Sequence, residues 1–104
     1  MKAITGTLLA LVVAVGGRGD GAKHNVVPKD GYVPTKDVAI KIAVAVWEPI
    51  YGADKIADEK PYRTTLTEGV WTVKGSLPKG AKGGVALAEI SKEDGCIIRV
   101  SHGK

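Results

Sequence analysis

The sequence predicts an α+β fold in which one main N-terminal helix packs on a four-stranded antiparallel sheet made of two β-hairpins. Apolar residues recur at helical spacing between Thr35 and Gly52. Two later segments, 62–75 and 85–102, alternate polar and apolar residues on both sides of a turn that contains glycine. With 104 residues, the chain is long enough for one domain and too short to enclose a large pocket.

The N-terminal segment has the composition of a signal peptide. Lys2 precedes an apolar run, Ala3–Val15, that is too short to span a bilayer as a helix and is followed by small residues. We therefore predict a signal peptide and cleavage region over residues 1–22, a flexible linker over 23–30 and the folded domain over 31–104. Cleavage would leave a periplasmic protein without stable membrane insertion. The alternative is a cytoplasmic protein in which this run is an N-terminal strand or core helix.

The main helix has recognisable start and stop signals. Thr35 is a good N-cap, and Asp37 lies in the first turn, where the helix dipole favours an anion. Pro49 is expected to kink the last turn and Gly52 to end the helix. The charged residues 53–60 then predict a short helical turn. The expected core stripe of the helix consists of Ala39, Ile42, Ala43, Val46 and Ile50.

The same helix carries further apolar residues outside this stripe: Val38, Ile40, Val44 and Trp47. Together with the stripe, they form more apolar surface than one sheet face needs. The helix is therefore expected either to be covered on a second side or to offer surface to a partner.

The first hairpin is predicted to turn at Glu68-Gly69. A two-residue turn there pairs Leu66 with Trp71 and Thr64 with Val73. Because side chains alternate between the faces of a strand, this register also fixes which residues meet the helix. They are Tyr62, Leu66, Trp71 and Val73.

The second hairpin allows two registers. A three-residue loop with Gly95 in the left-handed conformation pairs Ile90 with Ile98, whereas a four-residue loop sets Ile90 against Ile97. We prefer the first register because it places the charged residues on the outer face of the hairpin and the apolar residues toward the core. It implies two further cross-strand pairs: Ala88 with Val100, and Glu89 with Arg99 as an ion pair on the outer face.

Few residues in the chain could support catalysis or hold a metal or cofactor, and we predict none of these sites. Cys96 is the only cysteine and is expected to be a small strand residue, about 20 Å along that strand from His102. His24 lies in the predicted linker. The acidic pairs Asp58-Glu59 and Glu93-Asp94 fall in charged loops, where solvated carboxylates are expected.

Charge and glycine content bear on the kind of partner. The net charge of +4 comes from 15 basic and 11 acidic residues, and the lysines are scattered, which argues against nucleic-acid binding. The glycine-rich segment Lys79–Gly84 leads into a strand instead of a helix, so it is not a phosphate-binding loop. It is either a binding loop whose lysines meet an acidic partner or a simple connection. Trp47 and Tyr51 are residue types favoured at interfaces, with burial in the core as the alternative.

The predicted folded domain contains several short motifs. The first half contains Gly31-Tyr32-Val33-Pro34, Ala39–Ala43, Trp47 and Pro49–Gly52. The second half contains Glu59–Tyr62, Val70–Gly75, Leu77-Pro78, Gly83-Gly84-Val85, Glu89-Ile90 and His102-Gly103-Lys104. In order and spacing these motifs resemble the NTF2-fold immunity proteins of bacterial polymorphic toxin systems. The resemblance spans residues 31–104 and implies a reduced NTF2/cystatin-like fold without enzymatic activity.

The resemblance also implies a function: stoichiometric neutralisation of a cognate toxin, in the periplasm if the leader is exported. It implies no cofactor, and we expect a monomer or small homo-oligomer. The candidate partner-binding residues are Trp47, Tyr51, Asp54, Asp58, Glu59, Lys79 and Lys82. One alternative is a PepSY-like exported module that modulates a peptidase. Another, a small NTF2-like isomerase or hydrolase, would need a buried acid in a pocket, and Glu89, the only strand-borne carboxylate, is expected to face outward.

Overall fold

A computed structural model describes residues 24–103 of the chain. The predicted signal peptide, residues 1–22, lies outside the described residues. Residues 24–35 precede the first described helix without forming a helix or a strand.

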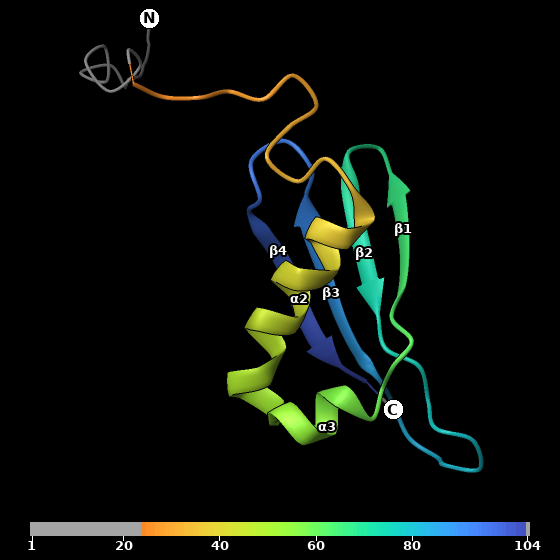
Figure 1. Ribbon diagram of the computed structural model, residues 1–104. Coiled ribbons are helices and arrows are strands. Elements are labelled where there is room, and N and C mark those ends of the chain that lie inside the picture. Colours follow the sequence, from red (N-terminus) through yellow and green to blue (C-terminus); the bar gives the residue numbers. More distant parts are fainter. Residues whose placement is uncertain (1–23, 104) are drawn as a thin grey trace, which may run out of the picture.

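Two helices are followed by an antiparallel sheet in the described part of the chain (Figure 1). The elements are α2 (Lys36–Tyr51), α3 (Ala53–Ala57), β1 (Arg63–Thr67), β2 (Val70–Lys74), β3 (Ala86–Ser91) and β4 (Ile97–His102). The strands lie in the sheet in the order β1-β2-β3-β4, and each is antiparallel to its neighbour. The helix α2 packs across one face of this sheet (Figure 1). The predicted fold class, one main helix on a four-stranded antiparallel sheet, is therefore confirmed.

The ends of α2 follow their sequence signals. The Thr35 hydroxyl accepts a hydrogen bond from the Val38 N–H at 3.4 Å, as expected of an N-cap. Pro49 lies within the last turns of the helix. Gly52 ends it with φ of 99° and donates its N–H to the Glu48 carbonyl at 2.8 Å.

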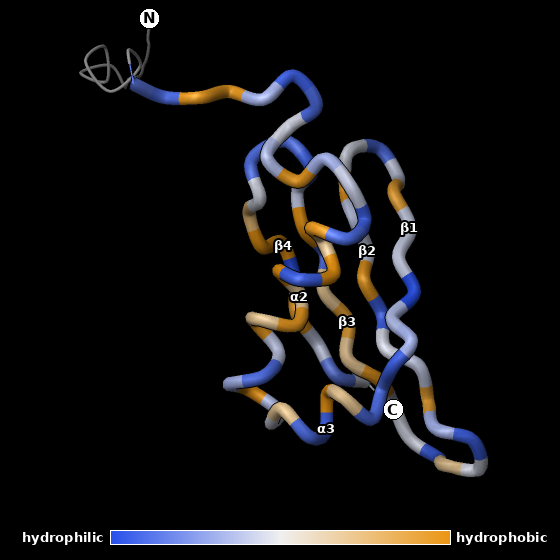
Figure 2. The backbone as a smooth tube through the Cα atoms, viewed as in Figure 1, coloured by the Kyte–Doolittle hydropathy of each residue, from blue (hydrophilic) through white to orange (hydrophobic). Residues whose placement is uncertain are grey.

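The buried stripe of α2 differs from the predicted one. Ala39, Ala43 and Trp47 have no exposed surface, whereas Ile50, placed in the predicted stripe, is 57% exposed. The stripe is rotated toward Trp47 because two alanines let the helix backbone approach the sheet, and the indole fills the space beyond them. Apolar periodicity gives a small alanine and a large isoleucine similar weight, so it could not locate this centre. Figure 2 shows the apolar positions along α2 and the strands.

The first hairpin has the predicted register, with Leu66 opposite Trp71 and Thr64 opposite Val73. Glu68 and Gly69 form the turn with φ of 49° and 79°. Two consecutive left-handed residues are typical of a type I′ turn, whose twist matches that of the strands it joins.

The second hairpin confirms part of the preferred register and corrects the rest. Ala88 pairs with Val100 and Glu89 with Arg99, but a β-bulge follows, and Ile90 pairs with Ile97. A bulge inserts one extra residue into one strand. The pairs before the bulge therefore follow the register of the three-residue loop, and the pair of Ile90 with Ile97 follows that of the four-residue loop.

Two residues near the turn, Ile98 and Cys96, differ from the prediction. Ile98 is 52% exposed, because it no longer lies opposite Ile90. Cys96 is also exposed and lies in the turn before β4, so its prediction as a strand residue is wrong. Its N–H donates to the Asp94 carboxylate at 2.9 Å, which fastens the backbone at this point.

The segment before α2 is hydrogen-bonded to the turn between β3 and β4. Tyr32 and Val33 donate their N–H groups to the Glu93 and Lys92 carbonyls, each at 3.0 Å. Val33 is buried, and its carbonyl accepts the indole N–H of Trp71 at 2.7 Å. These bonds place the start of α2 over the sheet.

Candidate partner-binding site

Trp47 is part of the core and does not reach the surface. It has no exposed area, and its indole N–H donates to the Leu87 carbonyl on β3 at 3.3 Å. Its ring lies at a tilt against Tyr62, with 5.7 Å between the ring centroids. The alternative reading of Trp47 as a core residue therefore holds, and the indole is not available to a partner.

Glu59 is also buried, contrary to the expectation of a solvated acid. Its side chain is 1% exposed and lies just after α3. One carboxylate oxygen accepts the Ala86 N–H at 2.7 Å, and the other lies 2.8 Å from Nε2 of His102 and 3.5 Å from Nζ of Lys55. A Cβ on Gly75 would lie 2.3 Å from Oε1 of Glu59, so the carboxylate occupies space that only glycine leaves free.

The surroundings of Glu59 keep it ionised. Burial has the largest single effect and raises its pKa, but the combined effects in the other direction leave the pKa below its ordinary value of 4.5. Those effects are the hydrogen bond from Ala86, the hydrogen bond and charge of His102, and the charge of Lys55. Glu59 therefore joins α3, the start of β3 and the end of β4 as a charged structural group.

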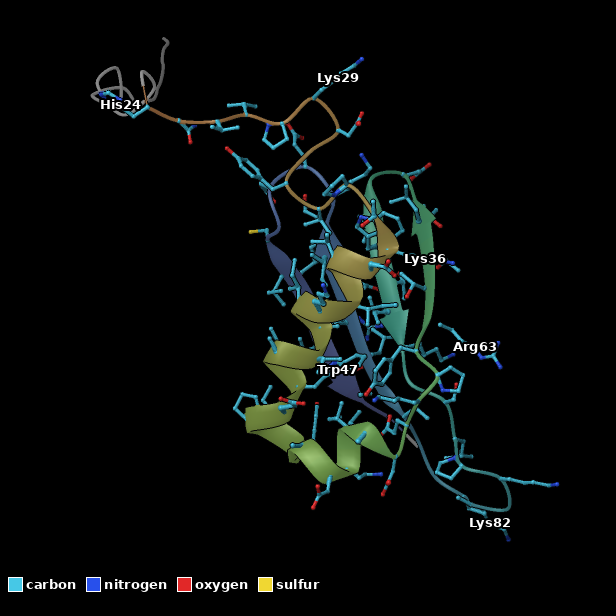
Figure 3. All side chains as sticks on the ribbon, viewed as in Figure 1. His24, Lys29, Lys36, Trp47, Arg63 and Lys82 are labelled. Carbon is cyan, nitrogen blue, oxygen red and sulfur yellow. The ribbon has the colours of Figure 1, made fainter. Side chains whose placement is uncertain are left out.

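The other predicted residues lie nearer the surface, in two places. Asp54 and Asp58 are exposed on and directly after α3, one helical turn apart. Tyr51 is half-buried at the end of α2, with its ring 5.0 Å from that of His102. Lys79 and Lys82 are exposed on the loop between β2 and β3, which projects beyond the sheet (Figures 1 and 3).

The base of this loop is fixed to the end of α3. The Ser76 N–H donates to the Glu59 carbonyl at 2.7 Å, and the Gly75 N–H donates to the Ala86 carbonyl at 2.9 Å. Farther out, a turn around Gly80 closes with a bond from the Ala81 N–H to the Pro78 carbonyl. The structure thus brings the acidic end of α3 and the root of the lysine loop to one end of the molecule, while the loop tip extends away.

A groove on the exposed side of α2 was not placed by the sequence. We call it the α2–α3 groove; it has a volume of about 350 Å³ and is lined by Ile40, Lys41, Val44, Ala45, Glu48, Ala57, Lys60 and Tyr62. The surplus apolar surface of the helix was its sequence signal, since Ile40 and Val44 belong to that surplus. What the pattern could not show is which later segment forms the second wall.

Tyr62 closes the floor of the α2–α3 groove. Its hydroxyl donates to the Ile56 carbonyl at 2.8 Å. Burial, followed by the negative charges of Glu48 and Glu59, raises the pKa of this phenol. Tyr62 therefore remains a neutral donor in a fixed position, and the groove presents an apolar floor with charged residues at its rim.

The described residues contain one buried acid, Glu59, which the sequence did not identify as buried. It lines neither the α2–α3 groove nor a second groove of about 820 Å³ beside residues 27–32 and the two hairpin turns. Within residues 24–103, no group of three or more His, Cys, Asp or Glu side chains could hold a metal ion. Neither of the described helices is long and apolar enough to cross a membrane.

Known proteins match most of the chain. Two uncharacterized proteins of Escherichia coli strain K12, YhhH and YbbC, are each 37% identical to it over 73 residues, or 69% of this chain. The chain spans 58% of the length of YhhH and 60% of that of YbbC. No solved structure matches it. A family model described as NTF2 fold immunity protein matches residues 38–104, from the first turn of α2 through the whole sheet. The chain therefore belongs to the family of NTF2 fold immunity proteins.

Proposed function

We propose that this protein neutralises a cognate bacterial toxin by binding it stoichiometrically and covering its active site or substrate channel. Membership of an immunity family supports the general role. We place the binding surface at the α2–α3 groove because the apolar side chains of Ile40 and Val44 are only half-buried there. Exposed apolar side chains with a charged rim are typical of protein interfaces.

The chemistry of the surroundings fits a protein partner. The rim of the groove carries the charged residues Lys41, Glu48 and Lys60. Two further exposed charges lie on α3 and directly after it, at Asp54 and Asp58. Charges around an apolar centre select and orient a partner more than they add affinity. A groove of about 350 Å³ accepts a few side chains, so we infer surface docking rather than enclosure of a substrate.

The test begins with a toxin gene next to the gene for this protein. The purified toxin should bind this protein in a one-to-one complex by titration calorimetry and lose its activity in that complex. Coexpression should restore growth to cells that carry the toxin. A neighbouring toxin that neither binds nor is inhibited would contradict the proposal, and copurification with a peptidase would favour the PepSY-like alternative.

One substitution tests the position of the interface. Ala45 is exposed and lines the α2–α3 groove, so Ala45→Arg fills the groove without entering the core. We expect at least a tenfold rise in the dissociation constant of the toxin complex, about 1.4 kcal/mol. Asn25→Arg adds the same charge at an exposed position outside the groove and serves as the control. If both variants protect cells from the toxin equally well, the interface does not lie at the α2–α3 groove.

The periplasm is the proposed place of action, since an immunity protein must meet its toxin. The support is the composition of residues 1–22, which is that of a signal peptide. A reporter fused to these residues should be exported and processed. Retention of the reporter in the cytoplasm would exclude this location.

A further inference from the structure

The outer edge of β1 is open for strand pairing. The sheet order makes β1 and β4 its two edge strands. The pairing of β4 is interrupted by a bulge, which bends a strand and protects an edge. β1 pairs with β2 without irregularity, contains no proline and carries a charge only at its first residue, Arg63, so the other common protections are absent from residues 64–67. Figure 1 shows no described element beyond β1.

The hairpin geometry identifies the free backbone groups on this edge. Residues that flank a two-residue turn form a hydrogen-bonded pair, and such pairs alternate along the ladder. Thr67 and Thr65 therefore bond to β2, while Thr64 and Leu66 direct their N–H and C=O groups outward. No hydrogen bond from another segment of residues 24–103 reaches these groups. The Leu66 side chain is also 44% exposed, so this edge is uncovered on the helix side too.

We propose that β1 pairs antiparallel with β1 of a second copy of this chain, in the register that sets Thr64 opposite Leu66 of the second copy. This register pairs both outward-facing residues of each edge with each other, and it keeps both helices on one face of a continuous sheet. Thr65 then lies opposite Thr65 of the second copy on the two-fold axis. Each Leu66 is covered by Thr64 of the second copy and lies diagonal to its Tyr62.

The charges at the ends of this pairing are complementary. The register sets Arg63 opposite Thr67 of the second copy, directly beside Glu68 of the second copy, and the two-fold axis repeats this at the other end. No two like charges lie opposite each other. A second copy is thus a partner whose free backbone groups, side-chain faces and charges all fit the edge.

The expected dimer is weak and reversible. Stable interfaces bury about 1,200–2,000 Å² in total, and one pair of five-residue strands buries less than that. We therefore expect a monomer in the low micromolar range and a growing dimer fraction toward millimolar concentration.

Substitutions on the two-fold axis give the sharpest test. Thr65 is exposed on the face away from α2, so Thr65→Lys and Thr65→Glu leave the core and the β1–β2 bonds intact. Each variant alone opposes two like charges and should raise the dimer dissociation constant at least about tenfold in sedimentation equilibrium. An equimolar mixture should restore dimerisation to the wild-type level or better. A wild type that stays monomeric to millimolar concentration, or a mixture that dimerises no better than either variant, would overturn the pairing.

A second pair of variants tests the backbone bonds. Leu66→Pro removes an outward N–H that takes no part in the β1–β2 ladder, and proline is tolerated at such an edge position. It should weaken the dimer more than Leu66→Ala, which loses the side chain but keeps the N–H; circular dichroism checks that both fold. Equal dimerisation by the two variants would overturn the register. Loss of toxin binding in Leu66→Pro, with a wild type that is monomeric throughout, would assign the edge to the toxin and also overturn self-pairing.

Discussion

The carboxylate of Glu59 connects residues that are far apart in the sequence. It binds the Ala86 N–H at the start of β3 and His102 at the end of β4, while Lys55 lies beside it on α3. A buried carboxylate is stable only where such partners replace water. At the scale of residues, this group holds the end of the molecule that carries α3 and the root of the lysine loop.

The first prediction concerns Glu59→Gln. Glutamine keeps the volume and an oxygen for the Ala86 N–H, but it loses the charge that faces His102 and Lys55. We expect the free energy of unfolding to fall by about 1–3 kcal/mol, measured by urea denaturation. Asp58→Asn removes an exposed carboxylate one residue away and should change stability by less than about 0.5 kcal/mol. Equal effects of the two changes would show that burial of Glu59 contributes nothing.

The second prediction concerns pH. The pKa of Glu59 is lower in the folded protein than its ordinary value of 4.5, so as the pH falls the unfolded chain takes up this proton first. The stabilisation by Glu59 is therefore fully present above pH 4.5 and is lost as the pH falls through the folded pKa. The difference in unfolding free energy between wild type and Glu59→Gln should have its full value just above that pH and shrink below it. A difference that grows on acidification would contradict this assignment.

At the scale of elements, the first hairpin contains a conformation that its sequence does not favour. Glu68 has φ of 49°, in the left-handed region that costs energy for residues other than glycine, asparagine and aspartate. The type I′ turn prefers Asn-Gly at these two positions. The glutamate is therefore retained at some cost in stability.

The third prediction follows from this turn. Glu68→Asn should stabilise the protein by about 0.5–1 kcal/mol, because asparagine adopts the left-handed conformation more readily. Thermal unfolding measures the gain. Glu68→Ala removes the same charge without improving the conformation and should give no gain. Equal stabilisation by both variants would attribute the effect to charge instead of to the turn.

At the scale of the whole molecule, the packing of α2 on the sheet depends on one large side chain. Trp47 is fully buried and lies one helical turn after Ala43 on the buried face of α2, and the sequence contains no phenylalanine that could share this role. A small domain has little stability to spare.

The fourth prediction is that Trp47→Ala leaves the chain largely unfolded. Truncation of a buried tryptophan costs about 3–5 kcal/mol, which approaches the whole stability of a small domain. Circular dichroism should show loss of the cooperative transition. Tyr51→Ala, at a half-buried position near the end of the same helix, should keep a transition at lower temperature. A well-folded Trp47→Ala would contradict the central position of the indole.

The parts of the fold that depend on local sequence could be predicted, and those that depend on distant contacts could not. The N-cap, the Glu68-Gly69 turn and the first hairpin register follow from neighbouring residues. The burial of Glu59 depends on Ala86 and His102, which lie 27 and 43 residues away. The bulge at Ile98 and the second wall of the α2–α3 groove likewise arise from packing between segments. Of the seven predicted contact residues, the packing buries two and leaves five on the surface or partly exposed there.

The fluorescence of the two tryptophans reports on the packing of the helix against the sheet, because both indoles are hydrogen-bonded within the fold. Trp47 and Trp71 are the only tryptophans, and each donates to a backbone carbonyl of a different segment, Leu87 and Val33. Both rings are shielded from water, so their fluorescence is expected at short wavelength while α2 is docked and should shift to longer wavelength when the helix leaves the sheet. Neither tryptophan lines the α2–α3 groove, the proposed binding surface, so a partner that binds there touches neither ring. Emission should therefore follow folding and stay unchanged on binding of a tryptophan-free toxin, which separates the two events in one sample.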